Sequence, residues 1–200
     1  IVFLYNGKRD GTSAACEVEN QHPNFRGRVF AFDVEISKDH DIHGELWHKL
    51  LLSAALGHID EMACGPNCKS WSILLHRIKR GYPSPRRSRG KPWEPLRKDD
   101  KMLDQESLLF LKPMLLVVLS KMVNHCTRFV FEHPEDPESH PERKQIWLTR
   151  EEAKSKIPSI WNTRFIREAK EYLGGDLQSF DQGPLGHDVR TSTTIDPEMH

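Results

Sequence analysis

The sequence lacks three features that would assign it to a class at once: a long apolar run, a net charge and a dense set of cysteines. Its longest apolar stretch, residues 108–122, is interrupted by Lys112, Pro113 and Lys121 and falls short of the roughly 20 residues that a membrane span needs. Acidic and basic residues number 29 each, so the chain as a whole has no electrostatic preference for nucleic acid. The four cysteines are scattered, which is typical of reduced thiols. We therefore expect an intracellular protein with no membrane association.

The chain also lacks an initiating Met, because it opens at Ile1 inside an apolar run. We expect it to be a segment of a longer polypeptide whose other domains are its neighbours. Two hundred residues suit one domain with a buried core.

Short apolar runs alternate with stretches of helical periodicity along most of the chain. The runs expected to form strands cover residues 1–5, 28–36, 58–64, 129–131 and 176–180, and the expected helices cover residues 13–19, 43–56, 104–125 and 159–173. Pro113 is expected to kink or break the third helix. A basic, Pro-rich insertion occupies about 76–101. The alternation predicts one α/β domain, Rossmann-like and doubly wound, with a mostly parallel sheet and helices on both faces.

Polar residues follow each expected strand. Asn6 and Gly7 follow the first strand, Asp33 lies near the end of the second, Cys68 follows the third and Glu132 follows the fourth. In open parallel sheets the ligand lies beyond the carboxyl ends of the strands, so these residues are the candidate site. A carboxylate at the end of the second strand commonly accepts hydrogen bonds from the ribose hydroxyls of a nucleotide.

Each of these residues also has a purely structural interpretation. Gly7 and Gly11 could be ordinary turn glycines, Asp33 could cap a strand end, Cys68 could be an inert core thiol and Glu132 could face solvent. For Cys68 and Glu132, a neighbouring residue favours a functional role. Lys69 would favour the thiolate of Cys68, and Pro134 fixes the direction of the chain after Glu132.

The segments GPNCKSWS (65–72) and FVFEHP (129–134), in this order, resemble the DNA cytosine-5 methyltransferases. Members of that family have a Gly-Pro-Pro-Cys nucleophile loop followed by a Glu-Asn-Val strand end. The resemblance is closer to divergent methyltransferase-like domains of retroelement-type polyproteins. It covers nearly the whole chain, with corresponding pieces at 3–7, 68–72, 86–93, 131–134, 159–161, 181–182 and 190–194.

The resemblance implies a methyltransferase fold, S-adenosylmethionine as cofactor and a nucleic acid substrate. Cys68 would be the nucleophile that adds to carbon 6 of cytosine, and Glu132 would hydrogen-bond the ring nitrogen and stabilise the developing charge. The target base would be flipped out of the duplex. The cofactor would lie against a set of turn and strand-end residues: Asn6, Gly7, Gly11, Asp33, Asp41 and Pro66.

Seven basic residues and no acid fall within residues 77–91. They are expected to contact phosphates of a nucleic acid, with affinity that depends on salt more than on sequence. The alternatives are a solvated loop and a localisation signal, which would imply a nuclear protein. The residues predicted to bind nucleic acid are Arg77, Arg80, Arg86, Arg87, Arg89 and Lys91.

Two other functions remain open at this point. Asn67 stands where the family has its second proline, and Lys8 and Arg9 interrupt the glycine turn, so the domain could be a degenerate member that serves as a binding or structural module. It could also be a different nucleotide-dependent enzyme that uses Gly7 and Asp33 but not Cys68. No metal site is predicted, because Cys64 and Cys68 are not followed by a second close pair. The remaining histidines, His133 among them, are expected at the surface.

Overall fold

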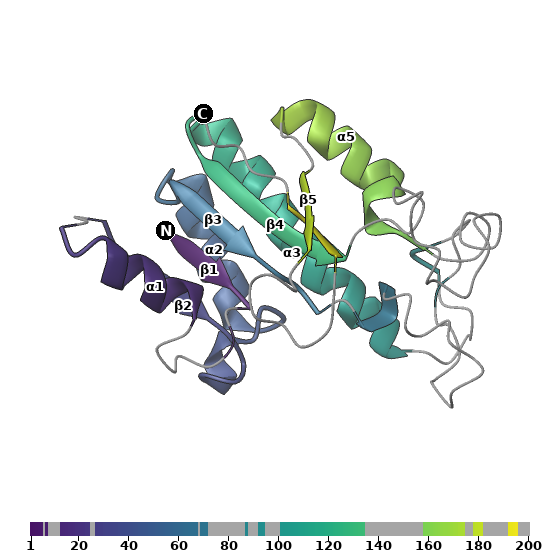
Figure 1. The fold of residues 1–200 in the computed structure, drawn as a ribbon, viewed down its shortest axis with the longest axis horizontal. Helices are drawn as coiled ribbons and strands as arrows, with labels where there is room; N and C mark the ends of the chain where they lie inside the picture. The colour runs from purple at the N-terminus through teal and green to yellow at the C-terminus, as the bar shows by residue number, and fades with distance from the viewer. Residues whose placement is uncertain are drawn as a thin grey trace.

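The computed structural model describes residues 1–5, 7, 13–24, 27–67, 69–71, 87, 92–94, 101–134, 158–174, 178–181 and 192–195. Within this part, one sheet has the strand order β2-β1-β3-β4-β6-β5 (Figure 1). Its strands are β1 (Val2–Leu4), β2 (Phe30–Phe32), β3 (Glu61–Cys64), β4 (Arg128–Pro134), β5 (Gln178–Asp181) and β6 (Ser192–Ile195). Strands β1 to β4 are parallel to one another, whereas β6 is antiparallel to both of its neighbours.

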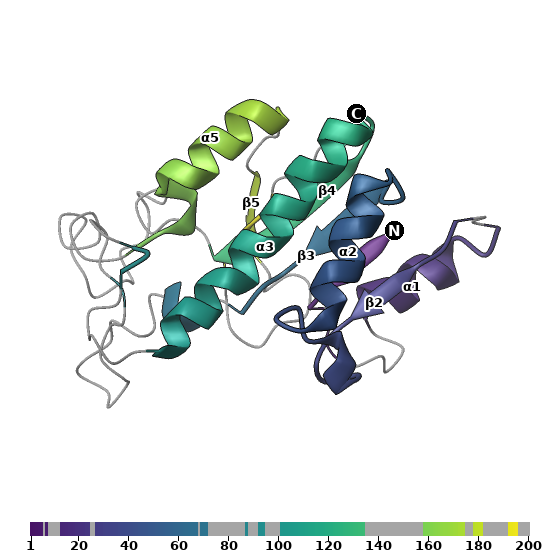
Figure 2. The same ribbon diagram turned by 180° about the vertical axis from the view of Figure 1, so that it is seen from behind.

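The helices that connect the strands are α1 (Ala14–Gln21), α2 (Glu45–Ala55), α3 (Lys101–Val123) and α5 (Arg164–Leu173). Helices α2, α3 and α5 cover one face of the sheet, and α1 lies on the other face beside β2 (Figures 1 and 2). This division follows from the strand order. The chain moves outward from β1 to β2 and then crosses back to β3, so two right-handed crossovers place α1 and α2 on opposite faces. The predicted α/β class is confirmed at this level.

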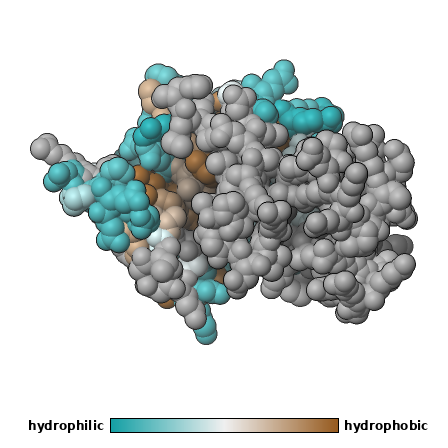
Figure 3. Space-filling view, viewed as in Figure 1, coloured by the Kyte–Doolittle hydropathy of each residue, from teal (hydrophilic) through white to brown (hydrophobic). Residues whose placement is uncertain are grey.

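The core lies between the sheet and the layer of α2, α3 and α5. Alternate residues of β3 and β4 point to this side and are almost completely buried, namely Met62, Cys64, Phe129 and Phe131. On the opposite face, Glu61 forms an ion pair with Arg128, its partner in the parallel register. Seen from that side, the described surface is mainly hydrophilic around a recessed apolar area over the sheet (Figure 3).

Two strand ends and the continuity of one helix differ from the sequence-based expectation. Strand β2 ends at Phe32 instead of residue 36, because Asp33 starts a turn by accepting a hydrogen bond from the Glu35 amide. Strand β4 extends to Pro134, because its last three residues pair with β6. Helix α3 continues through Pro113 without a break in the helix assignment.

None of the helices in the described ranges is long and apolar enough to cross a membrane.

Candidate functional site

The strand order reverses between β1 and β3, so the carboxyl ends of these two strands mark the position where open α/β sheets bind ligands. After β1 the backbone takes positive φ values at Tyr5 (61°) and at Gly7 (72°). Among the described residues, no atom lies within 4 Å of a Cβ added to Gly7. No described side chain therefore blocks the approach of a molecule to the Gly7 backbone at this end of the sheet.

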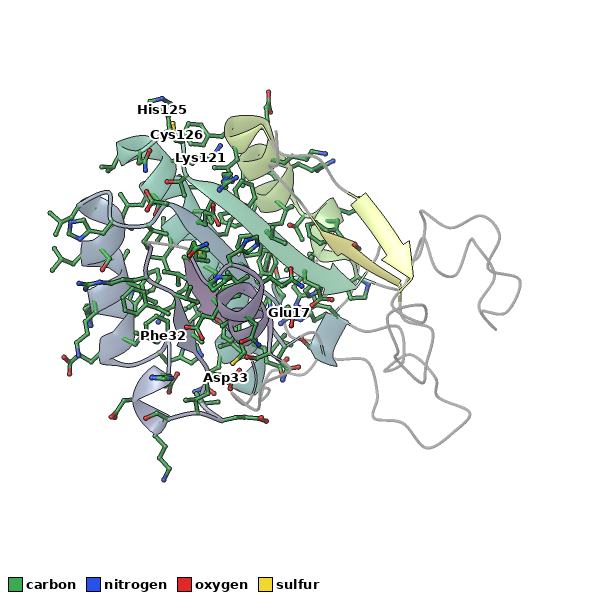
Figure 4. All side chains as sticks on the ribbon, turned by 60° about the vertical axis from the view of Figure 1, so that its left-hand side comes forward. Glu17, Phe32, Asp33, Lys121, His125 and Cys126 are labelled. Atoms are coloured by element: carbon green, nitrogen blue, oxygen red, sulfur yellow. The ribbon has the colours of Figure 1, made fainter. Side chains whose placement is uncertain are left out.

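Asp33 joins the ends of β1 and β2. Its Oδ2 accepts a hydrogen bond of 2.9 Å from the Gly7 amide, and its Oδ1 accepts one of 2.8 Å from the Glu35 amide. The Asp33 amide in turn donates to Nδ1 of His40, whose ring packs edge-on against Phe32. Figure 4 shows Asp33 and Phe32 at the opposite end of the molecule from Lys121 and His125. Asp33 thus lies beside the Gly7 turn, where the sequence places it.

A second polar group lies next to this turn, on the segment before α2. Asp41 accepts a hydrogen bond of 2.8 Å from the His43 amide. The ammonium group of Lys112 on α3 donates to the Ile42 carbonyl at 2.8 Å and lies 5.1 Å from the centre of the Trp47 ring. Burial lowers the pKa of Lys112, while the charge of Asp41 opposes this shift. Lys112 therefore fixes the segment that carries Asp41.

Tyr5 links the end of β1 to α3. Its hydroxyl donates a 2.6 Å hydrogen bond to the Leu109 carbonyl. Burial raises the pKa of Tyr5 far above its usual range, and the nearby thiol of Cys64 and the carboxylates of Asp41 and Asp33 add to this effect. The phenol is therefore neutral and acts as a hydrogen-bond donor.

Glu132 lies on β4 against the segment that follows β3. A Cβ added to Gly65 would lie 2.9 Å from Oε2 of Glu132, so only glycine permits this approach without a shift. Pro66 is buried beside it. Burial raises the pKa of the Cys64 thiol well above its usual value, and the charge of Glu132 adds to the shift. Cys64 is thus a neutral core thiol.

Some predicted site residues lie outside the described residues: Asn6, Gly11, Cys68, Arg77, Arg80, Arg86, Arg89 and Lys91. The expectation that Cys68 and Glu132 lie in one site therefore stays a prediction. Residues on both sides of Cys68 are described. Pro66 precedes it, and Ser70 and Trp71 follow it in a buried turn of 3-10 helix (Lys69–Trp71).

Arg87 is the one residue of the predicted phosphate-binding set within the described ranges, and it is fully buried. Its guanidinium lies 4.2 Å from the centre of the Trp71 ring and donates to Ser70 Oγ at 2.8 Å and to Ser107 Oγ at 3.1 Å. It also donates to the carbonyls of Pro92 and Leu103. Its N–H groups are directed at other protein atoms. The prediction that Arg87 contacts phosphate at the surface is therefore wrong. The spacing of basic residues gave no signal of this burial.

His133 also differs from expectation, because it is buried instead of lying at the surface. Its ring packs edge-on against Trp71, Phe110 and Trp161, at centroid distances of 6.0, 5.8 and 6.2 Å. The alternation along β4 could have indicated this, since His133 has the same parity as the buried Phe129 and Phe131.

No protein-family model, curated protein or solved structure matches this chain. Two carboxylates lie toward the carboxyl edge of the sheet. Asp33 follows β2, the neighbour of β1, and Glu132 lies in the last part of β4, the neighbour of β3. Such an edge can accept hydrogen bonds from a ligand at two positions.

Proposed function

We propose that this chain is a cytosine-5 methyltransferase-like domain that binds S-adenosylmethionine at the carboxyl edge of its sheet and acts on nucleic acid. The observation that carries the proposal is the placement of Asp33 and Glu132 on opposite sides of the point where the strand order reverses. A cofactor at this position would reach Asp33, and a base entering beside it would reach Glu132. The last segment of the resemblance, residues 190–194, overlaps β6.

The residues that follow β1 and β2 suit this cofactor. Each oxygen of Asp33 accepts one backbone hydrogen bond, which leaves further lone pairs for the hydroxyls of a ribose. The open space beside Gly7 provides room for the ligand. The carboxylates of Asp33 and Asp41 give this edge the negative charge that attracts a sulfonium cation. When bound, the cofactor would supply the methyl group.

The protein groups would prepare the base for this transfer. The Cys68 thiolate would form a bond to carbon 6 of the flipped cytosine, and the electron pair displaced from the 5,6 double bond would make carbon 5 nucleophilic. Glu132 would hydrogen-bond the ring nitrogen as the ring becomes electron-rich. After methylation, loss of the proton on carbon 5 would expel the thiolate and restore the double bond.

Cofactor binding can be tested by calorimetric titration of the protein with S-adenosylmethionine. We expect saturable binding by the parent protein, and an affinity at least about tenfold lower for Asp33→Ala, since hydrogen bonds to a charged group are worth about 1.5–3 kcal/mol. Asp39→Ala is the matched control, because Asp39 is an exposed acid of the neighbouring turn. An absence of binding by the parent protein, or an unchanged affinity in Asp33→Ala, would overturn the cofactor assignment.

Catalysis can be tested separately, by transfer of a labelled methyl group to cytosine-containing DNA and RNA. We expect Cys68→Ser and Glu132→Gln to lose transfer but to keep cofactor affinity. Asn67, in place of the family's second proline, favours a second candidate function, in which the domain binds the cofactor or nucleic acid without catalysis. Cofactor binding by the parent protein with no methyl transfer to either nucleic acid would favour that candidate.

A further inference from the structure

We propose that the outer face of α2 and α3 is an interface with a second copy of this chain, in which the two α3 helices pack antiparallel across a two-fold axis at Leu115. We call this surface the helical face. It consists of Leu52, Leu56, Leu108, Leu115, Met122 and Val123, which are exposed and apolar. The interface does not depend on the proposed enzymatic function.

The first observation is that no exposed charged residue follows Lys49 in α2 or Asp104 in α3. Beyond Gln105, the exposed residues of α3 are Leu108, Leu115, Met122 and Val123. Beyond Lys49, those of α2 and its C-cap are Leu52, Ala55 and Leu56. A helix that faces solvent normally carries polar residues on its outer side, and one that is apolar all round is normally covered. The helical face is therefore typical of a surface that is buried in an assembly.

The second observation is the spacing on α3. Leu108, Leu115 and Met122 recur every seven residues and are 40%, 49% and 67% exposed. Seven residues fall only about 20° short of two full turns, so these side chains form one stripe along about 20 Å of the helix. A stripe at this spacing is what packs against a second helix.

The stripe continues onto α2, so the surface is broad enough for an interface. A Cβ added to Gly57, just after α2, would lie 3.2 Å from Cγ1 of Val123 at the end of α3. The two helices lie side by side in both ribbon views (Figures 1 and 2). Six half-exposed apolar side chains give an area on the order of 600 Å², at the upper end of the patches found on monomers. With a polar rim this area approaches the roughly 800 Å² that each partner buries in a standard interface.

Charge at the two ends of α3 favours a second copy in antiparallel orientation. Asp104 is exposed near the start of the helix and His125 is exposed just beyond its end (Figure 4), whereas Lys121 is turned toward α5 and donates to the Leu173 carbonyl. A two-fold axis at Leu115 places Leu108 opposite Met122 and Asp104 opposite the segment of His125. The exposed Asp104 of each helix then lies beside the exposed His125 of the other, and the helix dipoles are also opposed. A parallel pair would place Asp104 against Asp104.

Sedimentation velocity over a range of protein concentrations tests the proposal. We expect a reversible dimer for the parent chain and a dissociation constant at least about 100-fold higher for Leu115→Glu, which would bury two unpaired charges at the axis. Val34→Glu is the matched control, because Val34 is 59% exposed but follows β2 and lies outside the helical face. Circular dichroism melting confirms that both variants are folded. A parent chain that is monomeric at every concentration, or a dimer that survives Leu115→Glu, would overturn the proposal.

Disulfide trapping tests the orientation in a background with Cys16, Cys68 and Cys126 replaced by Ser. We expect Leu115→Cys to cross-link to itself. Leu108→Cys and Met122→Cys should cross-link only when the two variants are mixed. Self-linkage of Leu108→Cys would overturn the antiparallel arrangement. The cross-linking result can be interpreted even if Leu115→Glu or Val34→Glu fails to fold.

Discussion

The hydroxyl of Tyr5 donates its hydrogen bond to the carbonyl of Leu109, which is the helix carbonyl that Pro113 leaves without an amide partner. In an α-helix the amide of residue i bonds to the carbonyl of residue i−4, and proline has no amide hydrogen. The residue at the end of β1 thus replaces the missing donor of α3. This explains why the helix continues through a proline that was expected to interrupt it.

Replacement of this donor should destabilise the protein in a way that depends on Pro113. We expect Tyr5→Phe to lower the free energy of unfolding by about 1–3 kcal/mol, because it leaves a partly buried carbonyl unsatisfied. In a Pro113→Ala background the alanine amide can bond to Leu109, so the same substitution should cost less. Urea unfolding of the four proteins of this double-mutant cycle measures the difference. An equal cost in both backgrounds would contradict the link.

Cys64 should make stability fall at alkaline pH. Its pKa is raised in the folded state, mainly by burial, so above the ordinary thiol pKa the unfolded chain loses a proton that the folded chain keeps. The unfolded state then binds fewer protons, and the free energy of unfolding decreases as pH rises through about 8.5 and above, by up to about 1.4 kcal/mol per pH unit. Cys64→Ala should be less stable than the parent at pH 7 but should show a flatter decline from pH 8.5 to 9.5 in urea unfolding. Parallel declines in the two proteins would argue against this assignment.

Arg87 should behave as a structural residue, unlike the other basic residues around it. Its substitution by Met removes hydrogen bonds to Ser70, Ser107 and two carbonyls, and we expect a loss of about 3 kcal/mol or more in the free energy of unfolding. Arg87→Lys should recover only part of this loss, because an ammonium group cannot reproduce the planar fork of the guanidinium. Thermal melting of both variants checks this expectation. Full stability of Arg87→Met would contradict it.

If the basic stretch binds nucleic acid, the test should leave Arg87 intact. Arg86→Glu combined with Arg89→Glu should weaken binding about equally for all sequences and flatten its dependence on salt, because phosphate contacts release counterions without reading bases. Filter binding at several salt concentrations measures both effects. An unchanged affinity in the folded double variant would assign the stretch to a solvated loop.

We expect substitution of Gly65 to affect the rate of methyl transfer more than the stability of the fold. The added methyl group of Gly65→Ala would push the Glu132 carboxylate away, and a shift of about 1 Å in a reacting group can lower the rate by about 100-fold. We therefore expect slower methyl transfer with unchanged affinity for S-adenosylmethionine. Gly44→Ala is the control, because its added methyl group would meet only the Asp41 carbonyl at 3.4 Å. Equal transfer rates in the two variants would exclude this role of Gly65.

The sequence predicts the arrangement of β1 to β4 well, because buried parallel strands read as short apolar runs between periodic helices. It also places Asp33 correctly, since the residue follows such a run. It does not predict the continuity of α3, because the donor that replaces the proline amide comes from Tyr5, more than one hundred positions earlier.

The sequence does not predict the direction of β6 or the burial of Arg87, because both depend on long-range contacts. The segment Ser192–Ile195 is too short and too polar to indicate a strand by periodicity, and only its pairing with β4 and β5 makes it antiparallel. Arg87 lies in a run of basic residues that reads as uniform, and it differs from its neighbours only through contacts with Trp71 and α3. Long-range contacts of this kind leave no local pattern.

The position of β6 has a consequence for the order in which the chain can be assembled. Among the described strands, β5 pairs only with β6, and β6 joins it to β4. During synthesis, β1 to β4 can associate as soon as residue 134 has left the ribosome. Strand β5 must wait until residues 192–195 have also emerged, although it is made earlier. A nascent chain that stalls before Ser192 would therefore expose both the edge of β4 and an unpaired β5, which is the kind of open strand edge that aggregates.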